Sequence, residues 1–210
     1  MFFGRAFERL GWKFIIFIAF LLGATAALFF ISERKKNAPY VPPEFLEART
    51  RTGSISENIV TIASASIDNL RNIRHEDVSG NYEGALDLVS AEIMRNEAAR
   101  QEALKLSYEL ATLAAQIELV RPEEAAQIGL QAALCGTQIT QHLINYNVYT
   151  NQLLEALRVG FATGTSAEEE SSAKVQGLID KMNEEAEAIN RLNREYKTAM
   201  GEFDALTRTQ

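Results

Sequence analysis

The residues of this sequence best suited to catalysis or metal binding are two histidines, His75 and His142, and a single cysteine, Cys135. Cys135 precedes His142 by seven residues, which places both side chains on one face of a helix, two turns apart. A single cysteine excludes an intrachain disulfide, a multi-cysteine zinc site and the C-x-x-C-H haem attachment. We therefore expect His142 to be hydrogen-bonded to a neighbouring side chain rather than bound to a metal.

The sequence also lacks the motifs of common enzymes. A di-iron carboxylate site in a helical bundle needs Glu-x-x-His, which places both ligands on one helix face. The residues three positions before His75 and His142 are Asn72 and Ile139, so this motif does not occur. The patterns of zinc proteases, phosphate-binding loops, dinucleotide-binding folds and serine hydrolases do not occur either. We predict that the protein is not an enzyme and holds neither a metal nor a cofactor.

A run of polar and aromatic residues around His142 interrupts the apolar pattern of its helix. In an antiparallel bundle, Asn96, Arg100 and Glu185 would lie at the same height as His142 and Tyr146. One interpretation is a polar layer in the core that fixes the register of the helices, as buried polar residues do in coiled coils. The other is a small pocket for a polar ligand. We favour the register layer and keep a small-molecule ligand as the alternative.

These residues must be positioned by helices, because apolar residues recur at spacings of three and four from residue 43 onward. Breaks at Ser79-Gly80-Asn81, Arg121-Pro122 and Thr163-Gly164-Thr165 divide this pattern into helices at about 43–77, 82–120, 122–162 and 166–207. The inner face of the third helix is predicted from Ala132, Cys135, Ile139, His142, Tyr146 and Leu153. Short loops make successive helices antiparallel. We predict an all-α fold with an up-down-up-down bundle of four long helices, packed like a coiled coil, over residues 44–210.

The N-terminal part of the chain reads as a membrane anchor. Residues 14–31 contain no charge, and a helix of this length spans roughly 27 Å, close to the thickness of the hydrocarbon core of a bilayer. We predict a tail at 1–13, a transmembrane helix at 14–32 and a basic, proline-rich linker at 33–43. The residues expected at the edges of the membrane are Trp12, Lys13, Arg34, Lys35 and Lys36.

A cleaved signal peptide is the alternative to an anchor, because Ala24-Thr25-Ala26 resembles a cleavage site. Cleavage there would leave the apolar run from Leu28 to Ile31 at a new N-terminus, so we favour the uncleaved, single-pass anchor. The count of Lys and Arg on the two sides leans slightly towards a cytoplasmic bundle. A first apolar segment usually starts translocation, and we expect the bundle outside the cytoplasm, with the cytoplasmic orientation as the alternative.

The charge of the domain beyond the anchor limits its partners. Of the 21 basic and 28 acidic residues, six and two lie within 1–36, which leaves 15 and 26 for the rest of the chain and a net charge of −11. Such a field repels phosphate backbones, and no basic stripe offsets it locally, so we do not expect the protein to bind nucleic acid.

Two functions remain open at the level of sequence. The first is a non-enzymatic scaffold of the cell envelope, held in the lipid bilayer, that binds a protein partner or a second copy of itself. The second is a ligand sensor that signals through a partner protein, since the predicted architecture resembles the four-helix periplasmic domains of chemoreceptors. That resemblance concerns the fold and does not by itself establish a function.

Overall fold

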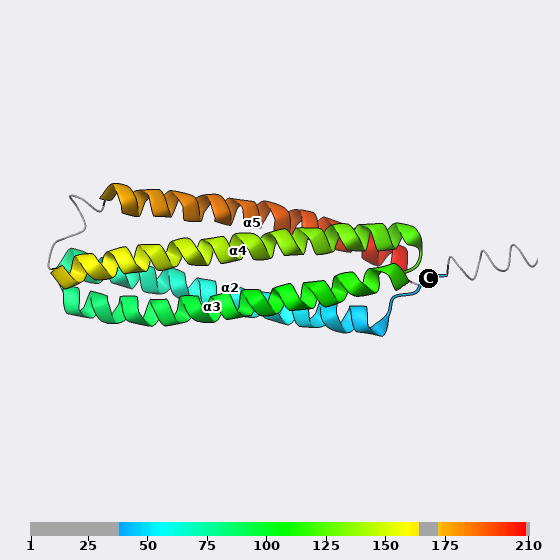
Figure 1. Cartoon of the computed structure of the whole chain (residues 1–210), viewed down its shortest axis with the longest axis horizontal. Coiled ribbons are helices and arrows are strands. Elements are labelled where there is room, and N and C mark those ends of the chain that lie inside the picture. The colour runs from blue at the N-terminus through cyan, green and yellow to red at the C-terminus, as the bar shows by residue number, and fades with distance from the viewer. Residues whose placement is uncertain (1–37, 164–171, 209–210) are drawn as a thin grey trace, which may run out of the picture.

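The computed structural model describes residues 38–163 and 172–208, which form an all-α four-helix bundle. Its long helices are α2 (Pro43–Ser79), α3 (Tyr82–Gln116), α4 (Glu123–Thr163) and α5 (Ser172–Thr207), with a short 3-10 helix η1 (Ile117–Leu119) after α3. Successive helices run in opposite directions along the bundle (Figure 1). The predicted fold class and the four helices are confirmed for this part of the chain.

The turn between α2 and α3 forms where the sequence predicts it. Gly80 has a φ of 76°, a left-handed conformation that glycine adopts without steric cost. The backbone N–H groups of Gly80 and Asn81 donate to the carbonyls of Asp77 and Glu76, which closes the end of α2. The Asn81 side chain then accepts a hydrogen bond from the Gly84 N–H at 3.2 Å and caps the start of α3.

The opposite end of the bundle, here called the base, holds the connection between α3 and α4 and the start of α2. Its linker is fixed to that connection, because Tyr40 and Arg121 exchange two backbone hydrogen bonds of 3.0 and 2.8 Å. Pro42 is fully buried beside them. The helix predicted at 82–120 is α3, which ends earlier than predicted, at Gln116. The 3-10 helix η1 follows it directly and ends at Leu119, shortly before the predicted break at Arg121-Pro122.

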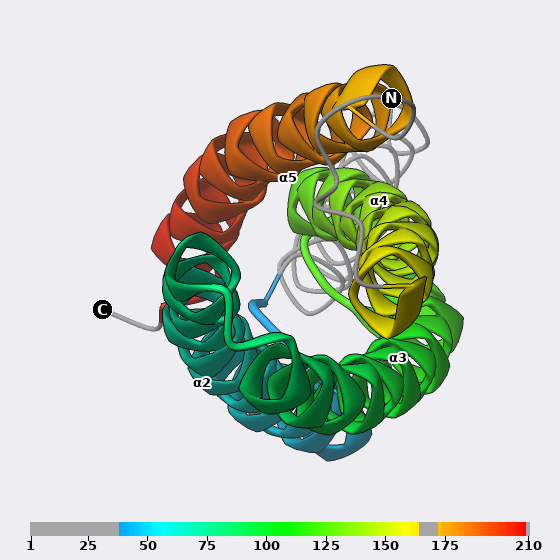
Figure 2. The same ribbon diagram turned by 90° about the vertical axis from the view of Figure 1, so that its left-hand side faces the viewer.

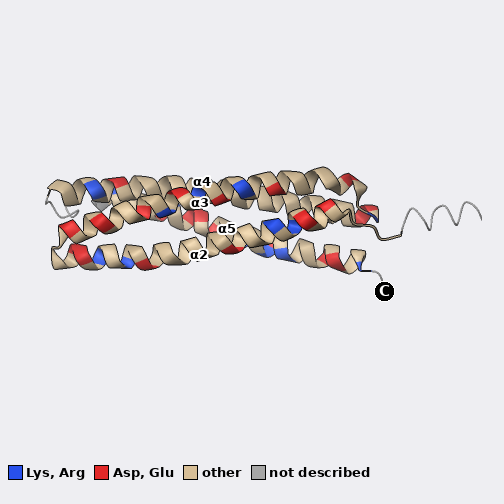
Figure 3. Cartoon of the chain, turned by 90° about the horizontal axis from the view of Figure 1, so that it is seen from below, with Lys and Arg blue, Asp and Glu red and all other residues tan. Residues whose placement is uncertain are grey.

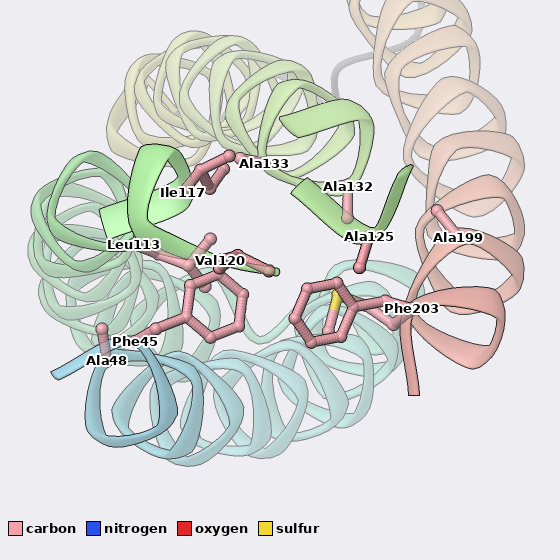
Figure 4. Packing of buried hydrophobic residues seen from close by; sticks show 11 residues of the cluster. Phe45, Ala48, Leu113, Ile117, Val120, Ala125, Ala132, Ala133, Ala199 and Phe203 are labelled. Atoms are coloured by element: carbon pink, nitrogen blue, oxygen red, sulfur yellow. The ribbon is translucent and has the colours of Figure 1, made fainter. Parts of the chain in front are cut away.

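The base also contains the largest apolar cluster. Phe45 of α2 and Phe203 of α5 stack with their ring centroids 5.1 Å apart. Leu113, Val120 and Ala125 pack around the two rings (Figure 4). All five residues are at most 2 % exposed, so the base is a dry core to which α2, α3, α4, α5 and the α3–α4 connection contribute.

Above the base the apolar core divides in two. One cluster joins α2, α3 and α4 around Ile73, Val89 and Phe161, and the other joins α4 and α5 around Leu153 and Met182. α2 packs on α3, α3 on α4 and α4 on α5. Viewed end-on, α5, α4, α3 and α2 follow one another around the bundle axis (Figure 2). The seam between α2 and α5 is therefore the weakest of the four.

The buried face of α4 is wider than the sequence pattern predicts. Cys135 and Leu153 of the predicted inner stripe are buried, but Ile139, His142 and Tyr146 are only half-buried. The missed part of the buried face consists of Ala125, Gly129, Ala133, Gly136, Thr140, Asn147, Thr150, Leu154 and Phe161. α4 lies between α3 and α5, so it buries one face against each neighbour.

The predicted tail 1–13, the transmembrane segment 14–32 with its flanking Trp12, Lys13, Arg34, Lys35 and Lys36, and the first part of the linker lie outside the described residues. The predicted start of the fourth helix at residue 166 does so as well, and α5 is described from Ser172. Of the helices within 38–163 and 172–208, none is both long and apolar enough to cross a bilayer.

Candidate functional site: a polar layer across the bundle

The structure brings His142 and Glu185 together. The Nδ1 atom of His142 on α4 lies 2.5 Å from Oε2 of Glu185 on α5. Asn145, one turn further along α4, donates from Nδ2 to the other carboxylate oxygen of Glu185 at 3.3 Å. Both partners are largely shielded, with 32 % of the His142 side chain and 14 % of the Glu185 side chain exposed. A partly desolvated contact of this kind ties α4 to α5 at one register.

Asn96 forms a second polar contact, between α3 and α4. Its side-chain Nδ2 donates to the backbone carbonyl of Asn147 at 2.8 Å, and both residues are buried. A backbone carbonyl that accepts a bond from another helix fixes the relative height of the two helices, because sliding either one would leave the amide unpaired. Asn96 thus sets the α3–α4 register, whereas His142 and Glu185 set that of α4 and α5.

A third contact, between α2 and α3, was not predicted from the sequence. Glu92 of α3 is fully buried. Its Oε2 accepts a hydrogen bond from Asn69 Nδ2 of α2 at 2.9 Å and a second from Arg95 one turn further along α3. Asn69 also donates to the carbonyl of Leu88 at 3.0 Å. Spacing carries a signal for Glu92, because it follows Val89 by three residues and precedes Asn96 by four on the same inner stripe.

Tyr146 and Arg100, the other two residues predicted for this layer, lie in different environments. Tyr146 is half-buried and packs against Leu153, Leu178 and Met182. Burial, and secondarily the negative charge of Glu92, raises the pKa of the Tyr146 hydroxyl. Arg100 is not in the layer: it is exposed and pairs with Glu97 of its own helix at 2.8 and 2.9 Å. Its placement in the core is corrected: Arg100 follows the fully buried Glu92 by eight residues, which turns it about 80° away from Glu92 around the helix axis.

One carboxylate oxygen of the layer has no partner. Oε1 of Glu92 is buried and accepts no hydrogen bond within the described residues. A hollow of about 240 Å³ lies in the seam between α2 and α3, two to three helical turns nearer the base than Asn69. Its lining is Asn58, Thr61, Ile62, Ala98 and Glu102, and no residue of the predicted layer contributes to it.

Metal and thiol chemistry find no support in the described helices. Within 38–163 and 172–208, no group of three or more His, Cys, Asp or Glu side chains is placed to hold a metal ion. Cys135 is buried, and desolvation raises the pKa of its thiol, with a smaller contribution from the charge of Glu195. A raised pKa disfavours the thiolate, the reactive form of cysteine. The arrangement can hold the helices in register.

Comparison of the chain with models of protein families, with curated proteins and with solved structures finds no match.

Proposed function

We propose that this protein is a membrane-anchored, non-enzymatic scaffold of the cell envelope. Residues 14–32 hold it in the lipid bilayer, and the bundle extends as a rigid rod that binds a protein partner or a second copy of the chain. We place the bundle outside the cytoplasm, with a cytoplasmic bundle as the alternative. The four helices contain 37, 35, 41 and 36 residues, so the rod is roughly 50–60 Å long.

The observation that carries this proposal is the internal pairing of the polar layer. His142 pairs with Glu185, Asn96 with the Asn147 carbonyl, and Glu92 with Asn69, each across a different helix seam. Side chains that satisfy one another across seams fix the register of the bundle and do not point at a ligand. A long helical body whose polar interior serves its own assembly suits a spacer or docking platform.

The unpaired Oε1 of buried Glu92 favours one other candidate, a sensor for a small polar ligand. A buried carboxylate oxygen without a donor costs free energy, and a ligand N–H or O–H would remove that cost. A sensor of this kind needs a partner to transmit its signal. A sensor requires a small ligand to reach Glu92 in the interior of the bundle, whereas a scaffold requires only contacts on the surface. Experiments can therefore distinguish the two functions.

Crosslinking in intact cells, followed by identification of the attached proteins, tests the scaffold function. A photo-reactive residue placed on the outer face of each helix should capture the same protein partner, or a second copy, reproducibly. Absence of protein crosslinks from every helix would contradict a scaffold.

Fractionation of cells tests the anchor. We expect the full chain in the membrane fraction after a high-salt wash, and a chain lacking residues 1–36 in the soluble fraction. Recovery of the full chain in the soluble fraction would refute the anchor.

A further inference from the structure

The face that α2 turns towards α5 carries exposed apolar residues. Arg49 marks this face, because its guanidinium pairs with Asp204 of α5. Val60, Ile67 and Val78 follow Arg49 by 11, 18 and 29 residues, close to three, five and eight whole turns of helix. They therefore lie on the same side of α2 as Arg49. Yet they are 65, 50 and 80 % exposed, so α5 does not cover them.

The facing side of α5 is also apolar and incompletely covered. Ala186, Ile179 and Val175 precede Asp204 by 18, 25 and 29 residues, again close to whole numbers of turns. All three are half-buried. Ile179 and Val175 pack against the α4–α5 cluster, which is separate from the cluster that includes α2. Above the Arg49–Asp204 pair, two apolar helix faces thus line the same open seam, here called the α2–α5 seam.

The charge of the α2–α5 seam is opposite to that of the domain. Arg74 lies 25 residues after Arg49 and Lys197 seven before Asp204, so each belongs to the face that its helix turns to the seam. Both are exposed, and neither pairs with a carboxylate within the described residues. Among the described residues, Asp204 is the one acidic residue on these two faces, and it already pairs with Arg49. The remaining charge of the seam is therefore positive. Elsewhere acidic and basic residues are interspersed along the helices (Figure 3).

We propose that the α2–α5 seam binds an amphipathic helix of a partner protein, with its apolar stripe between Val60, Ile67 and Val78 on one side and Ile179 and Ala186 on the other. Acidic residues on the flanks of that helix would face Arg74 and Lys197. This inference rests on the scaffold function and names its partner class. The stretch from Ser56 to Val78 rises about 33 Å, which fits a partner helix of about six turns.

The charge of the seam argues for an acidic partner. A helix that lays its apolar side into a groove is held by anchors spaced three, four and seven residues apart, and the seam offers that spacing. Complementary charge at the rim selects the partner and speeds association. A basic helix would fit the apolar walls equally well but would be repelled by Arg74 and Lys197, and a neutral helix would gain no attraction from them.

The test uses the full chain in lipid nanodiscs and a fluorescent synthetic helix of about 21 residues, with leucine at the core heptad positions and glutamate on the flanks. The control peptide has lysine in place of every glutamate. We expect fluorescence anisotropy to report binding of the acidic peptide that is about tenfold tighter than that of the control peptide and weaker at high salt. Equal binding of both peptides, or binding of neither, would overturn the proposal.

Matched variants locate the site. Ile67→Glu introduces a charge into the seam, and Val148→Glu does the same on an exposed apolar position of α4 outside the seam. We expect Ile67→Glu to weaken binding of the acidic peptide by about tenfold and Val148→Glu to leave it within about twofold. Arg74→Glu is the second seam variant, and its exposed position leaves the fold unaffected. Equal effects of all three variants would overturn the assignment to the seam.

Three further outcomes distinguish the seam proposal, self-association and the scaffold function from one another. If light scattering shows a dimer that Ile67→Glu converts to a monomer, a second copy occupies the seam and the partner-helix proposal is wrong. If the acidic peptide does not bind but crosslinking from other helices captures a protein, the seam proposal fails and the scaffold function stands. If crosslinking captures no protein from any helix, the scaffold function itself fails.

Discussion

The carboxylate of Asp204, near the end of α5, accepts two hydrogen bonds from the guanidinium of Arg49, near the start of α2, at 2.6 and 2.9 Å. This paired contact joins the first described helix to the last at the base, next to the stacked rings of Phe45 and Phe203. Hydrogen bonding to Arg49 lowers the pKa of the Asp204 carboxyl. The closure of the bundle therefore depends on an ion pair and a ring pair at one end.

The lowered pKa of Asp204 predicts a dependence of stability on pH. A carboxyl whose pKa is lower in the folded state stabilises the fold fully above its unfolded pKa of about 3.9, and this contribution is lost as pH falls through the folded pKa. We expect Asp204→Asn to lower the melting temperature at neutral pH, and the difference from the wild type to shrink as pH falls below the unfolded pKa and to vanish below the folded pKa. Thermal melts followed by circular dichroism at several pH values measure it.

Asp180 provides the control for this experiment. It is an exposed carboxylate on α5 that accepts a hydrogen bond from Gln176 of its own helix at 2.8 Å and bridges no other helix. Asp180→Asn should leave the melting temperature unchanged at all pH values. A constant difference between Asp204→Asn and the wild type across the whole pH range would show that the ion pair is not its cause.

The ring pair at the base should contribute more than the ion pair. Phe203 is 1 % exposed and contacts apolar residues of several helices, so Phe203→Ala leaves a cavity. We expect it to lower the free energy of unfolding by about 3–5 kcal/mol, as measured by urea denaturation. Leu134→Ala, on the exposed face of α4, should change it by at most about 0.5 kcal/mol. Similar losses for both variants would contradict the position of the core.

Periodicity predicted the helices well because each long helix buries apolar residues at helical spacing, and the loops contain residues that end helices for local reasons. Gly80 takes a left-handed conformation that ends α2, and Pro122 disfavours a helical conformation at the preceding residue, Arg121. The width of the buried face of α4 could not be read in this way. Gly136 is buried because α3 approaches closely: a Cβ at position 136 would lie 2.6 Å from Cδ2 of Leu110, which would have to shift.

The polar layer was predicted in part, for a related reason. Height along an antiparallel bundle follows from helix length, and this brought His142 and Glu185 to one level. Rotation about each helix axis depends on which neighbours it packs against, which the sequence does not state. Arg100 was placed inward although it faces solvent, and Glu92 was missed although it is fully buried.

The contact of Glu92 with Asn69 predicts strong coupling between these two residues. Asn69→Leu alone removes a hydrogen-bond donor from a buried carboxylate, and we expect it to destabilise the bundle by about 1–3 kcal/mol. Asn69→Leu combined with Glu92→Leu replaces both partners by apolar groups and should restore most of that loss. Urea denaturation of the two single variants and the double variant gives the coupling free energy. Additive losses would mean that the two side chains do not interact.

The last prediction separates a scaffold from a sensor at the contact between His142 and Glu185. A layer that only sets register tolerates apolar replacement of both partners, whereas a ligand site does not. We expect His142→Leu alone to lower the melting temperature, because Glu185 then keeps only the bond from Asn145. The double variant with His142→Leu and Glu185→Leu should unfold at or above the wild-type melting temperature. When it is expressed in cells that lack the protein, it should restore the wild-type phenotype. Replacing Arg100 as well is unnecessary, since it pairs with Glu97 on the surface. A double variant that is stable and reaches the membrane but fails to restore the phenotype would reject the scaffold interpretation of this layer and favour the sensor.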